Sequence, residues 1–255
     1  MDVPDAHVVS DSTVDKDDDT RDKETSKETD YGGGLLVVST NPNDWTRVLT
    51  LHHPSLAKAI GIHPWFVTSD HAKDLEAMAE LLRDFTELRV GEIGLDKSGR
   101  HKATYSSGLQ TIVFERQLAL AGEHQRSVSI HCVQSHGRLL DVLRELDRDL
   151  SRPVPRGVYL HSWSGSPDVT RDILRLKRVG PVIFFGVSLK INASRREIIE
   201  AIPLDRLLVE SDLQLNDPDR LRAMAEVVKL LVTIISPHEL VMNFERFLNL
   251  MSKSS

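Results

Sequence analysis

Short apolar runs recur along the chain and predict eight β-strands. Each run is rich in Val, Ile and Leu, and residues that favour turns or charged surfaces separate one run from the next. The runs are PDAHVV, LLVVST, LAKAIGIHP, LRVGEIGLD, SVSIHC, GVYLHSW, VIFFGVS and RLLVESD.

Most intervals between these runs carry amphipathic patterns of helical length. They lie at residues 70–84, 108–124, 136–149, 168–179 and 194–201, and two more follow the last run at 218–235 and 237–250. Strands that alternate with helices predict right-handed βαβ units and a parallel sheet. Eight such strands in 255 residues predict a single (β/α)8 TIM barrel domain over residues 1–255. A doubly wound open sheet is the alternative that strand counting does not exclude.

The segment from residue 10 to residue 34 interrupts this pattern. Val14 and Tyr31 are its only sizeable apolar residues, and nine acidic residues stand against four basic ones between Ser10 and Asp30. A segment of this kind cannot bury enough apolar surface to order itself. We expect a mobile acidic loop here, in place of the first barrel helix.

Charge and composition narrow the class of protein. The formal net charge is -6, and almost all of it lies in the acidic segment, so the body lacks the strongly basic surface that grips nucleic acid by charge alone. Cys132 is the only cysteine, which excludes an internal disulfide and fits a reducing compartment. No apolar run reaches the roughly 18 residues of a membrane span. We expect an intracellular monomer in the cytoplasm, the nucleus or both, with no membrane partner.

Residues capable of metal binding or acid–base chemistry end six of the eight predicted strands. A single histidine at a strand end is most often a hydrogen-bonded core residue. Six polar groups at the C-terminal rim of one barrel would be costly to desolvate without a cation or a substrate. The pattern therefore predicts a metal site at this rim, which carries His7, His63, Glu92, His131, His161 and Asp212.

Seven motifs carry a resemblance to a known family. GIHPWF, VGEIGLD, FERQLALA, VSIHC, LHSWSGS, FFGVS and LLVESD, in this order and spacing, resemble the TatD family of metal-dependent deoxyribonucleases, in particular its fungal and other eukaryotic members. The resemblance runs from about Asp5 to Phe247. It implies a TIM barrel of the metal-dependent hydrolase superfamily, two divalent ions, and DNA as the substrate whose phosphodiester bonds are hydrolysed.

The resemblance also implies roles for particular residues. Glu92 would bridge the two ions, and His131 and His161 would complete the first site. The second site would use His7 and Asp212, and Asp212 could also take a proton from the attacking water. Imidazole and carboxylate ligands suit zinc or manganese better than magnesium, although all three metals remain open.

Two further residues are expected near the metals. The resemblance gives His63 a contact with phosphate or with a metal ligand. Glu210 lies two residues before Asp212, on the same strand face, and could contact a metal ligand or substrate. A salt bridge in the barrel interior is an equally open interpretation of Glu210. Trp65 and Trp163 flank two of the histidines and could stack on a base or pack under a loop.

The first strand departs from the family pattern, because Val9 stands where a second histidine is expected. The second ion would then be weakly held, unless Asp11 replaces the missing ligand. Two functions follow: a working phosphodiesterase with a weakened second site, or a catalytically impaired barrel that serves as a binding or regulatory protein. Of the six metal-site residues that the family pattern implies, His7, Glu92, His131, His161 and Asp212 remain and only the one at position 9 is missing, which favours the hydrolase. An amide-cleaving amidohydrolase is less favoured, because Glu92 stands where many such enzymes use a carbamylated lysine.

Overall fold

The structure is a computed structural model that describes residues 5–9, 34–53, 56–214 and 217–249. The predicted acidic loop lies almost entirely outside these residues, so its mobility stays a prediction. All eight predicted strands are present: β1 Asp5–Val9, β2 Gly34–Val38, β3 Leu56–Ile60, β4 Arg89–Asp96, β5 Val128–Val133, β6 Val158–Leu160, β7 Ile183–Val187 and β8 Leu207–Val209. A short unpredicted strand, β9 (Leu213–Gln214), follows them.

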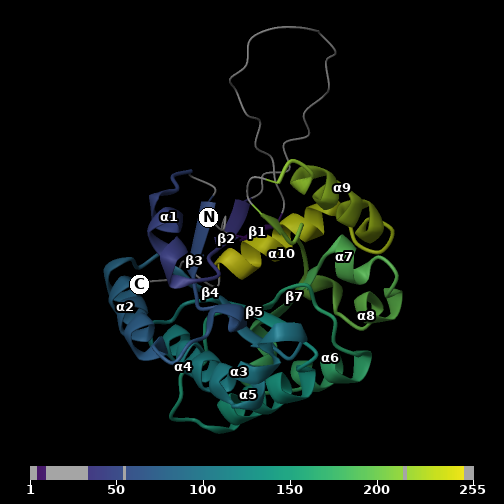
Figure 1. Cartoon of the computed structure of the whole chain (residues 1–255). Helices are drawn as coiled ribbons and strands as arrows, with labels where there is room; N and C mark the ends of the chain where they lie inside the picture. The colour runs from purple at the N-terminus through teal and green to yellow at the C-terminus, as the bar shows by residue number, and fades with distance from the viewer. Residues whose placement is uncertain (1–4, 10–33, 54–55, 215–216, 250–255) are drawn as a thin grey trace, which may run out of the picture.

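Strands β2 to β8 pair in sequence order, and every pair among them is parallel. These seven strands curl into a half-barrel with helices outside it (Figure 1). The architecture confirms the prediction of a (β/α)8 TIM barrel.

The first strand runs in the direction opposite to the one expected. β1 pairs antiparallel with β2, with His7 opposite Leu36 and Val9 opposite Gly34, and antiparallel with β9. Parallel neighbours need a crossover connection, usually a helix, whereas antiparallel neighbours need only a loop. The acidic sequence between β1 and β2 has no amphipathic helical pattern, which accounts for the change of direction.

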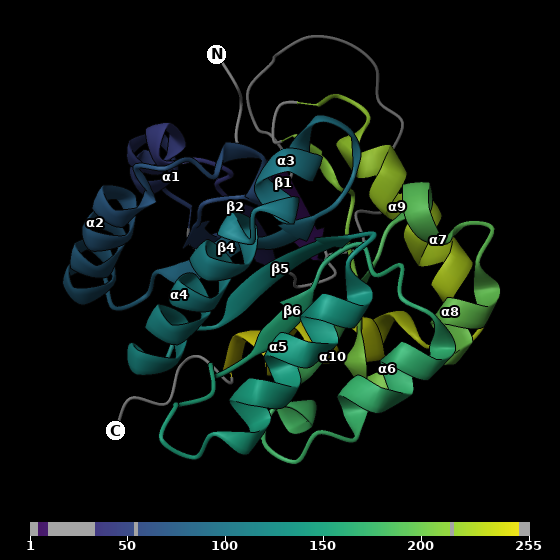
Figure 2. The same ribbon diagram turned by 60° about the horizontal axis from the view of Figure 1, so that its bottom comes forward.

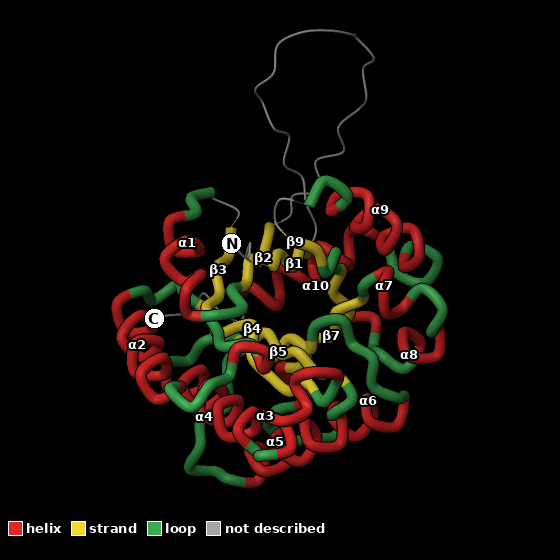
Figure 3. Tube along the Cα trace, in the orientation of Figure 1, coloured by secondary structure: helices red, strands yellow, loops and turns green. Residues whose placement is uncertain are grey.

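The seven predicted helices are present, and Figure 3 shows the helices as an outer ring around the strands. They are α2 His71–Asp84, α4 Leu109–Glu123, α5 His136–Arg148, α6 Pro167–Leu174, α8 Arg196–Glu200, α9 Arg220–Leu231 and α10 Pro237–Asn249. Three short helices, α1 Trp45–Thr50, α3 Lys102–Ser106 and α7 Leu189–Asn192, were not predicted. Among the described residues, no helix combines the length and apolar character that a membrane span requires.

Two apolar layers hold the barrel together. Outward-facing strand residues pack under the surrounding helices, and Figure 2 shows α4, α5 and α6 along one side of the sheet. Inward-facing residues form a second cluster with two aromatic residues of α10: Leu36, Val38, Ala57, Ala59, Tyr159, Phe184, Leu208, Phe244 and Phe247. Phe247 lies against Gly157, just before β6 begins, so α10 covers the N-terminal end of the barrel. The C-terminal end is left for polar groups.

Gly94 of β4 offers a test of this packing. Its φ is 142°, and a Cβ there would overlap the carbonyl oxygen of His131 on β5. We expect Gly94→Ala to lower the free energy of unfolding by roughly 2–4 kcal/mol, measured by urea denaturation. Gly137→Ala is the control, because a Cβ at this helical glycine of α5 would meet nothing within 4 Å. Equal stability of the two variants would contradict the close approach of β4 to β5.

Candidate metal centre

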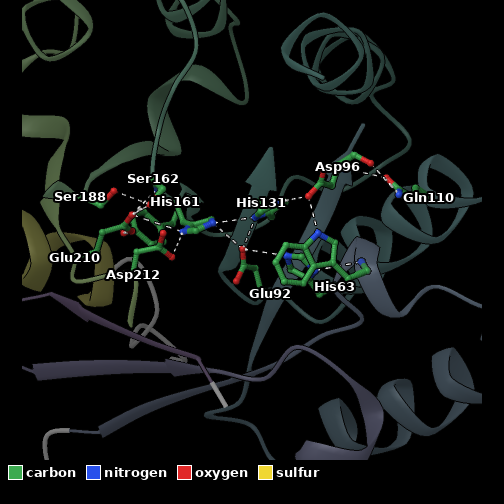
Figure 4. Close-up of polar contacts among 12 residues, drawn as sticks. His63, Glu92, Asp96, Gln110, His131, His161, Ser162, Ser188, Glu210 and Asp212 are labelled. Atoms are coloured by element: carbon green, nitrogen blue, oxygen red, sulfur yellow. Dashed lines mark hydrogen bonds and ion pairs between the residues drawn. The ribbon is translucent and has the colours of Figure 1, made fainter. Parts of the chain in front are cut away.

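Three predicted histidines converge on one carboxylate oxygen (Figure 4). Glu92 is only 2% exposed. Its Oε1 lies 2.7 Å from Nε2 of His161, 3.0 Å from Nδ1 of His131 and 3.7 Å from Nε2 of His63. The structure thus brings together residues from β4, β5 and the segments that follow β3 and β6.

Strand alternation and a buried glutamine place these side chains. Side chains of a strand point alternately to its two faces, so His131 points inward while Ile130 and Cys132 join the outer core. His63 follows β3 in a loop that Gln117 of α4 holds. The Gln117 amide accepts a hydrogen bond from the main-chain N–H of Ile62 at 2.7 Å and donates one to its carbonyl at 3.1 Å.

The prediction that Glu92 ends its strand is wrong, because β4 continues to Asp96. Asp96 is a further site residue that the sequence analysis missed. It is 1% exposed, and its Oδ2 lies 3.3 Å from Nε2 of His131 and accepts a 2.6 Å hydrogen bond from Nε1 of Trp65. A usable signal was present, since two acidic residues four positions apart in one strand share a face. Asp96 thus holds the ring nitrogen of His131 that points away from Glu92.

Glu210 and Asp212 flank the other end of His161. Their oxygens lie 3.6 Å and 3.8 Å, respectively, from its Nδ1. Glu210 is fully buried and accepts hydrogen bonds from the Tyr159 hydroxyl and from the main-chain N–H and hydroxyl of Ser162. These bonds occupy both oxygens of Glu210 and favour an interior network over direct contact with substrate. Asp212 differs, because 22% of its side chain is exposed.

The predicted second ligand group is only partly visible. The backbone of His7 lies in β1, but its side chain is outside the described part of the structure. Asp212 follows β8 and approaches His161 rather than joining the atoms around Glu92. The pairing of His7 with Asp212 therefore stays a prediction.

The buried charges perturb the histidines in different directions. Burial lowers the pKa of His131, but hydrogen bonds with Asp96 and Glu92 outweigh burial and raise it overall. Burial also lowers the pKa of His161, but the charges of Glu92 and Glu210 outweigh burial and hold that pKa well above its usual value. Burial and the neighbouring His131 push the pKa of His63 well below its usual value. The raised pKa values favour the protonated forms of His131 and His161 beside these buried carboxylates.

The atoms around Glu92 have the spacing and chemistry of a metal site. His63, Glu92 and His131 each offer one ligand atom within 4.8 Å of the others. Glu92, His131 and His161 form a tighter set, with 2.7, 3.0 and 3.1 Å between their atoms. These three atoms lie close enough together that Glu92, His131 and His161 would hold one divalent ion between them. The two sets share Glu92 and His131, and their mixed nitrogen and oxygen donors suit zinc or manganese.

Metal binding at these residues should release protons. A metal and a proton compete for the same nitrogen lone pairs of His131 and His161. Because the pKa values of these two residues are raised, apparent metal affinity should increase as pH rises through them and fall below them, by up to about ten-fold per pH unit for each proton displaced. Calorimetric titration in two buffers of different ionisation enthalpy would measure the protons released. Metal binding without proton release would contradict ligation by these histidines.

Comparison with known proteins identifies the family. The family model described as TatD related DNase matches residues 4–246. The chain is 30% identical over 187 residues to the 3'-5' ssDNA/RNA exonuclease TatD of Klebsiella pneumoniae, and the match covers 70% of this chain and 66%, just under two thirds, of that protein. It is 26% identical over 266 residues to the Cut9-interacting protein scn1 of Schizosaccharomyces pombe, covering 71% of this chain and 79% of that protein.

A solved structure supports the fold independently. The crystal structure of YjjV, a TatD homologue from Escherichia coli, superposes with a TM-score of 0.70 over 86% of each chain. At 24% sequence identity, this likeness supports the barrel fold alone. The family match, by contrast, spans nearly the whole chain and both strands that carry Glu92 and His131. The chain therefore belongs to the TatD family of metal-dependent hydrolases.

Proposed function

We propose that this protein is a divalent-metal-dependent phosphodiesterase that cleaves DNA. The observation that carries the proposal is the buried Glu92 oxygen within 3.7 Å of three imidazoles. Glu92, His131 and His161 would hold the first ion, with His63 beside them. His7, Asp212 and the shared Glu92 would hold a second, weaker ion.

The remaining polar residues would position the ligands and move the proton. When bound, the ions would stabilise the negative charge that develops on the phosphodiester. Asp96 and Glu210 would orient His131 and His161 through the nitrogens that face away from Glu92. Asp212 is the most exposed of the site carboxylates and would accept the proton of the attacking water.

The names of relatives support a nucleic-acid substrate. The Klebsiella relative is named as an exonuclease acting on single-stranded DNA and RNA from the 3' end. We propose single-stranded DNA as the principal substrate, and RNA is the comparison that tests this choice. The exposed Trp65 lies beside the candidate metal centre. An exposed aromatic ring suits an unpaired strand, because the bases of such a strand can stack on it.

Metal content and cleavage together test the proposal. The purified chain would be stripped with chelator, reconstituted with zinc, manganese or magnesium, and analysed for bound metal. End-labelled single-stranded DNA and RNA of the same sequence would then be incubated with each form. We expect metal-dependent cleavage of DNA. A protein that binds no metal after reconstitution and cleaves neither strand would overturn the proposal.

A catalytically impaired binding protein is the second candidate. Val9 favours it, because valine offers no ligand atom where the family pattern has a histidine. The printed name of the fission-yeast relative, a Cut9-interacting protein, also records a protein interaction for a member of the family. This candidate predicts metal or partner binding without hydrolysis.

Cleavage by the metal-loaded protein distinguishes the two candidates. Val9 pairs with Gly34, the first residue of β2, so the antiparallel β1 carries Val9 away from the C-terminal ends of the other strands. In the hydrolase, chelator-stripped protein that is reconstituted with manganese should regain cleavage of DNA. If the reconstituted protein binds metal but cleaves neither DNA nor RNA, the impaired barrel is the better description.

A further inference from the structure

Trp65 is the one exposed tryptophan of the three in the chain. It is 46% exposed, whereas Trp45 and Trp163 are 5% and 1% exposed. Trp65 lies in a short 3-10 helix, η2 (Pro64–Phe66), directly after His63. An exposed aromatic ring beside the candidate metal centre is available to contact a bound substrate.

The indole of Trp65 is held firmly on the side of the metal centre. Its Nε1 donates to Asp96 Oδ2 at 2.6 Å, and the same oxygen lies 3.3 Å from Nε2 of His131. The main-chain N–H of Trp65 donates to Nδ1 of His63 at 3.2 Å. Two residues around Glu92 are therefore tied to Trp65, one directly and one through a single carboxylate.

The indole already stacks against another flat ring. The imidazole of His101 lies parallel to it, with 5.1 Å between ring centroids and 9° between planes. His63 approaches nearly at right angles, with a centroid separation of 4.9 Å. Trp65 therefore keeps a fixed orientation while almost half of its surface remains open. A rigid, partly exposed aromatic ring can stack on a nucleobase with little loss of side-chain freedom.

We propose that Trp65, with His101 behind it, is a stacking platform for a nucleobase next to the scissile phosphate. Asp96 is the positioning residue that sets the platform relative to His131. The platform would favour unpaired strands, since a base inside a duplex cannot present its face to a side chain. This inference rests on the proposed nuclease function and adds the group that recognises the substrate.

Two oligonucleotides separate base recognition from phosphate recognition. One is a single-stranded oligothymidylate, and the other has the same length and phosphates but abasic residues. Loss of the indole bond to Asp96 should affect cleavage of both strands. We therefore expect Trp65→Ala to lower kcat/KM about ten-fold more on the thymidine strand than on the abasic strand, with the difference mainly in KM. Trp65→Phe keeps a ring but loses the bond to Asp96, so its effect should be smaller.

Phe85→Ala is the matched control. Phe85 is also an exposed aromatic residue, at 38%, but it follows α2 and precedes β4, at the opposite end of the barrel. Its removal should leave cleavage of both strands unchanged. If Trp65→Ala lowers cleavage of both strands equally, or of neither, the platform is wrong.

A binding measurement separates failure of the platform from failure of the proposed function. Tryptophan fluorescence would be followed as each strand is added to an Asp212→Asn variant in the presence of manganese, and the same variant with Trp65→Phe would give the signal of the other two tryptophans. Quenching by the thymidine strand but not by the abasic strand supports the platform, even if the wild-type protein cleaves neither strand and the nuclease proposal fails. Equal or absent quenching by the two strands overturns the platform.

Discussion

Replacing Glu92 with glutamine should lower DNA cleavage by about a thousand-fold or more and remove the tightly bound metal. The amide keeps the size of the side chain but loses the charge on which His63, His131 and His161 converge. Without that charge, a buried divalent ion loses its central anionic ligand, and every step that needs the ion is affected. Cleavage rates and metal content of the purified variant provide the measurement.

Glu80→Gln provides the control for charge removal, because Glu80 is a glutamate of α2 whose side chain is 69% exposed. It should leave cleavage and metal content unchanged. Thermal unfolding of Glu92→Gln would show that the barrel is intact. A folded Glu92→Gln protein that retains its metal and cleaves DNA within ten-fold of the wild-type rate would contradict the bridging role.

Asp212→Asn should lower kcat by roughly 10²–10⁴-fold while the first ion stays bound. Asp212 lies 3.8 Å from His161 and outside the tight group around Glu92. Its carboxylate is also the one that solvent reaches most readily among the acids of the site. An amide cannot accept the proton of the attacking water, so turnover should fall more than substrate affinity.

The metal content of Asp212→Asn is the necessary companion measurement. Retention of the first ion with loss of turnover supports proton transfer by Asp212. Complete loss of metal would show that Asp212 acts chiefly as a ligand. Normal turnover would remove Asp212 from the reaction.

Periodicity predicted most of the barrel because its strands are short and bounded by turns. The inward and outward alternation that buries Tyr159 among inner residues and Leu160 among outer ones is visible in the sequence. The direction of β1 was not visible, because it depends on how the chain returns to β2 rather than on the residues of the strand itself.

Helix ends were harder to predict where a distant residue decides them. The predicted helix at 168–179 ends at Leu174. The carboxylate of Asp147, from α5, accepts hydrogen bonds from the main-chain N–H groups of Lys177, Arg178 and Val179. These bonds give the main-chain N–H groups an acceptor outside the helix. The local sequence pattern could not predict this acceptor, because Asp147 lies about 30 residues earlier in the chain.

The candidate site was predictable where residue type alone was informative. Histidines and acids at successive strand ends identified the three imidazoles around Glu92. Asp96 was not predicted because the sequence pattern placed the end of the strand at Glu92, whereas β4 continues for four more residues. The different environments of Trp65 and Trp163 depend on tertiary packing, so the sequence left both interpretations open for each.

The most direct test is a crystal structure of the protein soaked with manganese, with an anomalous difference map. The proposed function predicts a strong peak bonded to Glu92, His131 and His161, at about 2.0–2.3 Å from the ligand atoms. A second, weaker peak nearer Asp212 would agree with the proposed second ion. A map with no peak beside Glu92 at millimolar manganese would contradict the metal centre and the hydrolase built on it.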